Sequence, residues 1–106
     1  MNLYDEGQST AFVPEIIISY QTPLTAAGNA FLLQSAIFWG DVSAEFLIYK
    51  NDEIVGGART SASAQTVQVE YVSPIPFNPG DELIVTAEHS TTGLRNFKAN
   101  LIGRMT

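Results

Sequence analysis

The sequence predicts an all-β protein, a single-domain antiparallel β-sandwich of about seven or eight strands. Apolar and polar residues alternate with a period of two through most apolar segments, and helical spacing is hard to find. Turn-forming residues interrupt these segments about every 8 to 12 positions. The chain has 106 residues, 45% hydrophobic and 15% charged, so we expect one core and one domain, over residues 13–106.

The first third of the chain is expected to hold an arm and two strands. Residues 1–12 lack a periodic pattern and are predicted to form an extended N-terminal arm, ordered only by docking onto another surface. A β-branched strand follows over 13–20 and ends in a break that contains Pro23 and Gly28. Residues 30–39, AFLLQSAIFW, are apolar on both faces, which favours a central strand. A helix is the alternative for this segment alone.

A hairpin is predicted in the middle of the chain. Residues 43–50, SAEFLIYK, alternate as a strand. Asn51 and Asp52 follow, and both side chains tolerate the left-handed backbone angles of a tight turn. Gly56 and Gly57 interrupt the second arm of the hairpin, which indicates a bulge or a strand end.

Three more strands complete the expected sandwich. Residues 66–72, TVQVEYV, alternate cleanly, and the prolines of the following SPIPF are expected to end the strand. Pro79 and Gly80 suit a tight turn, because proline presets φ and glycine accepts positive φ. Strands are then predicted over 82–88 and 95–105.

The segment PFNPGDELIVTAEHS contains Asp81, Glu82, Glu88 and His89. These residues are close together in the sequence, as in an active-site cluster, but we do not expect them to be close together in the fold. In an extended strand Glu82 and Glu88 share a face but lie about 20 Å apart, so they cannot share a proton or a metal. We interpret the acids as strand-end and turn residues, and His89 as a solvated loop histidine.

Composition and motifs exclude several functions. The net charge of −6 and the scattered basic residues argue against nucleic acid as a partner. The absence of cysteine removes disulfides and thiolate metal sites, and no apolar run approaches the ~20 residues of a membrane span. No nucleophile elbow or phosphate loop is present, so we predict no enzyme activity, cofactor or metal.

Two binding alternatives stay open. A loop calcium site could be assembled from Asp41, Asp52 or Asp81, although no EF-hand pattern surrounds them. A sugar platform could use the exposed rings of the chain. The rings available for it are Trp39, Tyr20, Tyr49 and Tyr71.

An open sandwich leaves strand edges and outward apolar side chains that need a cover. Either a second sheet of the same domain or a neighbouring subunit supplies it, and we favour a homo-oligomer. The residues predicted to bind a protein partner are Leu3, Tyr4, Phe12, Trp39, Leu47 and Val72.

The order of these segments, from AFLLQSAIFW through SAEFLIYKNDEIV and VEYVSPIPFNPGDELIVTAE to FKANLIGRM, is similar to small jelly-roll-like domains. It resembles domains of the tumour-necrosis-factor and C1q type, and especially the short β-sandwich accessory proteins of tailed bacteriophage virions. The resemblance implies a non-enzymatic virion structural protein, assembled in the host cytoplasm. Its role would be that of a capsid decoration (cement) protein that forms homo-oligomers, with trimers favoured, on capsid or tail subunits. A receptor- or glycan-binding module of a phage tail or fibre is the alternative.

Overall fold

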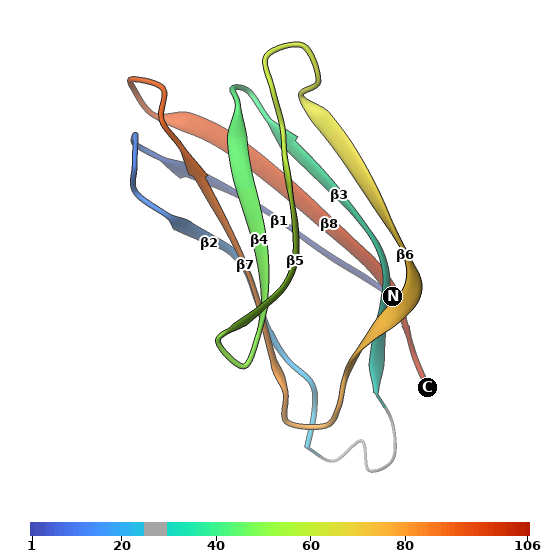
Figure 1. Ribbon diagram of the computed structural model, residues 1–106. Coiled ribbons are helices and arrows are strands. Elements are labelled where there is room, and N and C mark those ends of the chain that lie inside the picture. Colours follow the sequence, from blue (N-terminus) through green and yellow to red (C-terminus); the bar gives the residue numbers. More distant parts are fainter. Residues whose placement is uncertain (25–29) are drawn as a thin grey trace.

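The computed structural model describes residues 1–24 and 30–106, and within these ranges it contains eight strands in two facing sheets (Figure 1). Gly28, in the predicted break, lies outside the described residues. None of the described segments is a helix with the length and apolar character needed to cross a bilayer. The strands are β1 (Asn2–Ser9), β2 (Glu15–Gln21), β3 (Phe31–Gly40), β4 (Ala44–Lys50), β5 (Glu53–Arg59), β6 (Thr66–Phe77), β7 (Glu82–His89) and β8 (Arg95–Met105).

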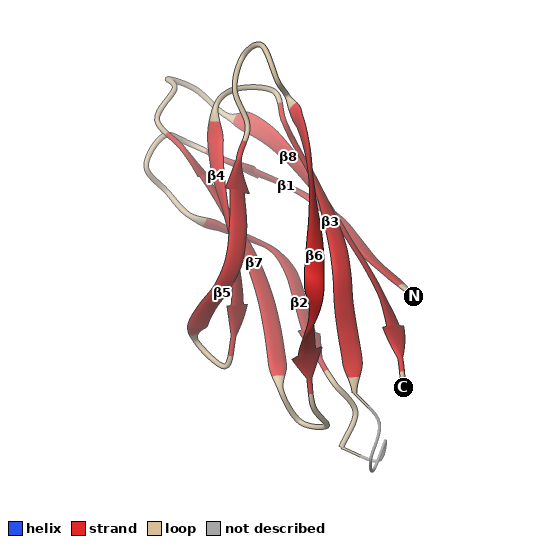
Figure 2. Ribbon diagram, turned by 45° about the vertical axis from the view of Figure 1, so that its right-hand side comes forward, coloured by secondary structure: helices blue, strands red, loops and turns tan. Residues whose placement is uncertain are grey.

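The two sheets are antiparallel and interleaved along the chain. Sheet A has the strand order β1-β8-β3-β6, and sheet B has the order β2-β7-β4-β5. Figure 2 shows the described chain as strands joined by loops, with the two layers facing each other. This is the strand order of an eight-stranded jelly roll, in which two Greek keys fold over one another. The predicted antiparallel, jelly-roll-like β-sandwich is therefore confirmed.

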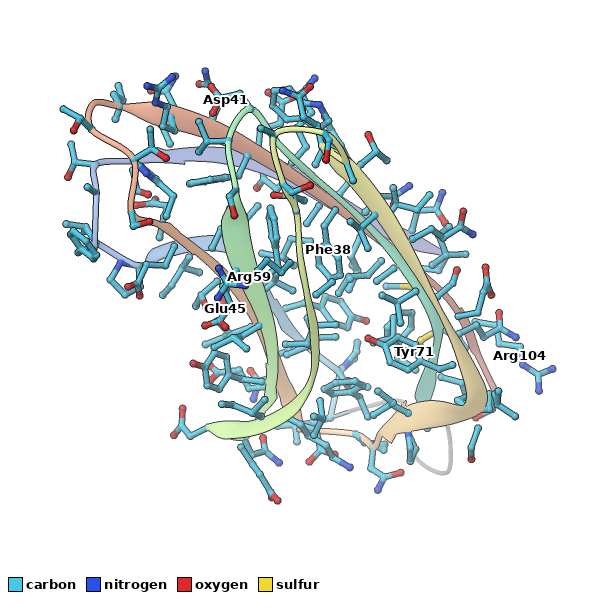
Figure 3. All side chains as sticks on the ribbon, turned by 45° about the horizontal axis from the view of Figure 1, so that its top comes forward. Phe38, Asp41, Glu45, Arg59, Tyr71 and Arg104 are labelled. Carbon is cyan, nitrogen blue, oxygen red and sulfur yellow. The ribbon has the colours of Figure 1, made fainter. Side chains whose placement is uncertain are left out.

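The core is a layer of aromatic and aliphatic side chains between the sheets. Phe38 of β3 stacks on Phe46 of β4 with ring centroids 4.9 Å apart, and Phe97 of β8 meets Phe46 edge-on at 5.9 Å. All three rings have no exposed surface, and Figure 3 shows Phe38 inside the sandwich. Burial of each such ring stabilises the fold by about 1.5–3 kcal/mol, so these contacts join the two sheets.

Residues 2–9, which were predicted to belong to an arm outside the sandwich, form strand β1 at the edge of sheet A. This strand pairs with β8 over its whole length without a register shift. The prediction was wrong because Leu3, Asp5 and Gly7 share the face toward sheet B, and only Leu3 packs against the core. A strand held mainly by backbone pairing leaves no apolar period in its sequence.

Strand β3 is central, as predicted, and the helix alternative is excluded. Its apolar character on both faces has a local cause, a register shift between Leu33 and Ser35. Before the shift Phe31 and Leu33 are buried, and after it Ala36 and Phe38 are. The bulge thus moves the inward positions by one residue, as an extra residue in a strand does.

Strand β6 continues through Pro74 and Pro76 to Phe77, whereas the sequence was expected to end it at residue 72. The correction has a simple reason. Strand β6 is an edge of sheet A, where a proline need not donate a ladder hydrogen bond. Pro76 keeps its place opposite Leu32 of β3.

The predicted hairpin between β4 and β5 is confirmed. Asn51 and Asp52 have φ values of 49° and 68°, which is the backbone of a type I′ turn. Gly56 lies beside a register shift in the β4–β5 pairing, so the glycine pair marks a bulge and not a strand end. A Cβ on Gly57 would lie 2.4 Å from the carbonyl oxygen of Phe46, which makes glycine necessary there.

Candidate functional site

The acidic segment around residues 81–89 does not converge into a catalytic site. Asp81 accepts hydrogen bonds from the Asn51 side chain and from the Asn78 backbone, both at 2.9 Å. The hydrogen bond from Asn51, aided by the Asn78 backbone and the charge of Lys50, holds the pKa of Asp81 below its ordinary value. Asp81 therefore fastens the β6–β7 turn to the β4–β5 turn, which agrees with its interpretation as a turn residue.

His89 is buried, with 3% of its surface exposed, and the expectation of a solvated loop histidine was wrong. It is the last residue of β7 and shares the inward face with Leu83, Val85 and Ala87, as strict alternation along the strand requires. Its Nε2 lies 2.7 Å from the Ser9 carbonyl oxygen, and its Nδ1 accepts from the Thr91 amide at 3.1 Å. These contacts place the ring proton on Nε2 and occupy both nitrogens.

Over residues 1–24 and 30–106, no group of three or more histidine, aspartate or glutamate side chains is arranged to hold a metal ion. The three candidate calcium ligands also lie apart. Asp52 and Asp81 belong to the β4–β5 and β6–β7 turns at one end of the sandwich (Figure 1), whereas Asp41, labelled in Figure 3, follows β3 at the other end.

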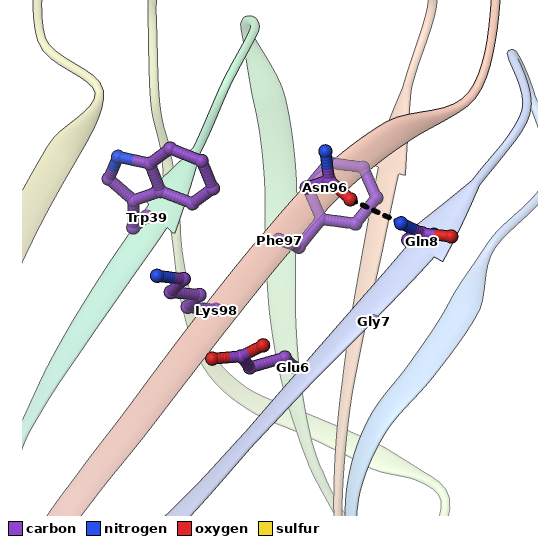
Figure 4. A pocket seen from close by; sticks show the side chains of 7 residues that line it. All are labelled: Glu6, Gly7, Gln8, Trp39, Asn96, Phe97 and Lys98. Atoms are coloured by element: carbon purple, nitrogen blue, oxygen red, sulfur yellow. Dashed lines mark hydrogen bonds between the residues drawn. The ribbon is translucent and has the colours of Figure 1, made fainter.

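The outer face of sheet A carries a hollow of about 430 Å³, which we call the Trp39 hollow (Figure 4). Strand register builds it, because Glu6 of β1 lies opposite Lys98 of β8, and Lys98 lies opposite Trp39 of β3. Gln8 lies opposite Asn96 in the next outward row. The residues that line the hollow are Glu6, Gly7, Gln8, Trp39, Asn96, Phe97 and Lys98.

The side chains of the Trp39 hollow are held by contacts with one another. The Lys98 ammonium nitrogen lies 5.2 Å from the centroid of the Trp39 ring, within the range of a cation–π interaction. Gln8 Nε2 donates to Asn96 Oδ1 at 2.6 Å. The Asn96 side-chain and backbone nitrogens donate to Asp41 Oδ2 at 3.3 and 3.2 Å. The hollow therefore combines one aromatic ring with amides and one charge of each sign.

A second surface feature lies at the end of the sandwich where β1 turns into β2. Phe12 is 71% exposed and has a φ of 62°, in the left-handed region that phenylalanine rarely adopts. Its amide donates to the carbonyl oxygen of His89 at 2.7 Å. Figures 1 and 2 both show the β1–β2 and β7–β8 loops side by side. The exposed residues Phe12 and Val13, consecutive in the β1–β2 loop, form what we call the loop-end patch.

The six predicted partner-binding residues do not form one surface. Tyr4 and Trp39 lie on the outer face of sheet A, and Phe12 lies in the loop-end patch. Leu47 is half-buried on β4 of sheet B, and Val72 is fully exposed on the edge strand β6. The sixth, Leu3, packs against the domain's own core.

The polar residues of the Trp39 hollow were missed by the sequence reasoning. Two of them, Glu6 and Gln8, lie in β1, the segment that was expected to be an arm. The other two, Asn96 and Lys98, lie in β8, 88 or more residues further along the chain. Only the β1–β8–β3 register brings them to Trp39. Alternation along the predicted strand 95–105 puts Asn96 and Lys98 on one face, and this is the one signal in the sequence that points to the hollow.

No family model matches the chain, and no curated protein does. Among solved structures, the chain is similar to the crystal structure of the insecticidal delta-endotoxin Cry8Ea1 from Bacillus thuringiensis, with a TM-score of 0.55 and 12% sequence identity. The match covers 94% of this chain and 20% of that chain. The likeness concerns the fold alone, and this chain spans about a fifth of the length of the toxin.

Proposed function

We propose that the chain is a non-enzymatic virion structural protein, a capsid decoration (cement) protein that stabilises the particle through contacts with its own copies and with capsid or tail subunits. The observation that supports this most strongly is Phe12, an aromatic side chain that is 71% exposed on a backbone with a φ of 62°. A strained and exposed aromatic residue lowers the stability of an isolated domain, whereas at a subunit contact its ring can be buried.

The conformation of Phe12 is unfavourable twice over. A left-handed backbone costs a non-glycine residue about 1–2 kcal/mol. Exposure of the ring also forgoes the roughly 1.5–3 kcal/mol that burial of such a side chain gives. Strained residues that persist are concentrated at functional positions, and large exposed apolar side chains mark interaction surfaces. Burial of Phe12 on a partner would recover the second of these terms.

The surroundings hold Phe12 in place. Its amide is hydrogen-bonded to the His89 carbonyl, and the buried His89 ring reaches the Ser9 carbonyl on the other side of the same loop. Val13, the next residue in the chain, is 49% exposed and extends the apolar surface. An exposed aromatic ring on a fixed backbone has the character of an interface hot spot, because little entropy is lost when it binds.

The strand edges support self-association as a second means of contact. Strand β1 offers an outer edge of eight residues that contains neither proline nor lysine. Val72, at the edge of the same sheet, has a fully exposed side chain. Edges of this kind accept a strand or a loop from a neighbour. The assembly we propose is a homo-oligomer, with a trimer favoured by the resemblance to virion accessory proteins.

The test compares Phe12→Ser with Ile54→Ser, because Ile54 is 58% exposed on β5, outside the loop-end patch. Light scattering after size-exclusion chromatography gives the oligomeric state, and co-sedimentation with capsids that lack this chain gives attachment. We expect Phe12→Ser to weaken attachment at least about tenfold, which corresponds to 1.4 kcal/mol, and Ile54→Ser to bind as the unmodified chain does. Absence of capsid binding by the unmodified chain, or equal binding by both variants, would overturn the proposal.

A further inference from the structure

The outer face of sheet A carries the Trp39 hollow, which the proposed assembly role does not use. We propose that the Trp39 hollow binds a neutral saccharide, with one pyranose ring resting against the Trp39 indole and its hydroxyl groups bonded to Gln8, Asn96 and Glu6. The hollow, of about 430 Å³, lies within the roughly 300–1,000 Å³ of small-molecule sites. It lies on the outer surface of sheet A, where Figure 4 shows Trp39, Lys98 and Glu6 side by side across three strands, so a longer glycan could continue beyond it.

Trp39 provides the apolar surface. The C–H faces of a pyranose ring are apolar, whereas its rim carries hydroxyl groups, so the sugar is complementary to an indole bordered by polar side chains. Trp39 directly precedes Gly40, the last residue of β3, which packs against Thr60 so tightly that an added Cβ would lie 2.9 Å from Thr60 Oγ1. The strand behind the indole is therefore fixed, and the Lys98 ammonium lies over the ring, 5.2 Å from its centroid.

The polar groups of the hollow have unused bonding capacity. Gln8 donates one side-chain N–H to Asn96 Oδ1, which leaves its second N–H and its side-chain carbonyl oxygen available to a ligand. Asn96 donates one side-chain N–H to Asp41, which leaves its other side-chain N–H available. Glu6 accepts the Tyr4 hydroxyl on one oxygen and has the second free among the described residues. Hydrogen-bond donors and acceptors thus lie together in the hollow. A sugar hydroxyl group can donate to one of them and accept from another at the same time.

The charges favour a neutral sugar over an anionic one. Glu6 and Lys98 are opposite each other on adjacent strands, so the hollow carries one negative and one positive group. Asp41 lies beside the hollow, where it accepts a hydrogen bond from Asn96, and the chain has a net charge of −6. A sialic acid, uronic acid or phosphate would approach through an unfavourable field.

The hollow is also built before any ligand arrives. Strands β1, β8 and β3 pair without a register shift through the rows that hold Glu6, Gln8 and Trp39, since the only shift of β3 lies at Leu33 and Ser35. The floor of the hollow is the backbone of Phe97, whose side chain is fully buried in the core on the opposite face. Sites carried by paired strands require little ordering on binding.

The experiment uses the full chain. Binding is screened on a glycan array, and the best neutral oligosaccharide is titrated by calorimetry and by intrinsic fluorescence, which reports the hollow directly because Trp39 is the only tryptophan. We expect a neutral glycan to bind and to change the fluorescence. Trp39→Ala should weaken it at least about tenfold and Gln8→Ala about threefold, whereas Trp39→Phe should keep most of the affinity.

Phe12→Ala is the matched control, an exposed aromatic outside the hollow, and it should bind the glycan as the unmodified chain does. Circular dichroism melts of each variant establish that it is folded. Absence of any glycan binding, binding of acidic glycans only, or equal affinity in Trp39→Ala and the unmodified chain would overturn the proposal. Failure of the assembly proposal appears elsewhere, as unchanged capsid binding by Phe12→Ser, so the two outcomes are distinguishable.

Discussion

At the loop end an aromatic ring is held out in solvent by its own backbone, whereas in the Trp39 hollow an aromatic ring is held by the side chains of neighbouring strands. Phe12 has a φ of 62° and its amide is tied to His89. Trp39 has an ordinary strand backbone and is flanked by Lys98 at 5.2 Å. Changes to side chains in the hollow should therefore leave the fold nearly intact, whereas changes near the loop end should alter stability.

Both regions depend on β1, which supplies Glu6 and Gln8 to the hollow and the Ser9 carbonyl to His89. Deletion of residues 1–9 should therefore have the largest effect, a loss of at least about 3 kcal/mol from a stability that is typically 5–15 kcal/mol. Strand β8 would become an edge, and the apolar contact of Leu3 would be lost. Urea unfolding measures the loss. Tyr4→Ser, which keeps the backbone of β1, is the control, and an unchanged midpoint after deletion would show that β1 is dispensable.

His89→Ala tests the base of the loop end. The change leaves the Ser9 carbonyl and the Thr91 amide without their partner and opens a cavity beside Phe97, whose ring centroid is 5.6 Å from that of His89. We expect a loss of roughly 2–3 kcal/mol in the free energy of unfolding. Glu88→Ala, at the neighbouring outward position, should stay within about 0.5 kcal/mol. A similar loss in both variants would mean that His89 is no anchor.

The strain at Phe12 can be measured by comparing two truncations. Phe12→Gly and Phe12→Ala remove the same exposed ring, but only glycine adopts a φ of 62° without a steric penalty. Phe12→Gly should therefore be the more stable of the two by about 1 kcal/mol in thermal or urea unfolding. If alanine proved as stable as glycine, the loop would have relaxed, and the case for a strained anchor would be lost.

The smallest effect is expected in the hollow. Gln8→Ala removes a hydrogen bond between two exposed amides, which is worth about 0.5 kcal/mol because water replaces it. The β1–β8 backbone pairing remains, so hydrogen exchange of the β8 amides should not change. A loss above about 2 kcal/mol would mean that the polar row of the hollow is structural.

The two regions also show how far the sequence could predict the structure. The strands predicted over 43–50 and 82–88 are present, and alternation along them puts Phe46, Ile48, Leu83 and Val85 on the buried faces. The asparagine–aspartate turn was predicted correctly because its chemistry is local. The same alternation, continued by one residue pair, would have placed His89 inside. It was instead assigned to a loop because a histidine followed by serine and threonines is typical of one.

What the sequence could not provide were features that depend on partners far along the chain. Strand β1 has one apolar inward residue and is defined by its pairing with β8. The bulge in β3 made a one-sided strand look apolar on both faces. The continuation of β6 through Pro74 depends on its being an edge strand. The residues of the Trp39 hollow could not be predicted for the same reason, since they meet only when three strands are in register.

The antiparallel pairing of the first and last strands has a mechanical consequence. Asn2 is opposite Ile102, so the two ends of the chain leave the sandwich side by side, as both ribbon views show. The ladder bonds between β1 and β8 run perpendicular to the strands. A pulling force applied between the two ends would load these bonds one after another, as in opening a zipper. It would dismantle the Trp39 hollow before it reached the tie between Ser9 and His89.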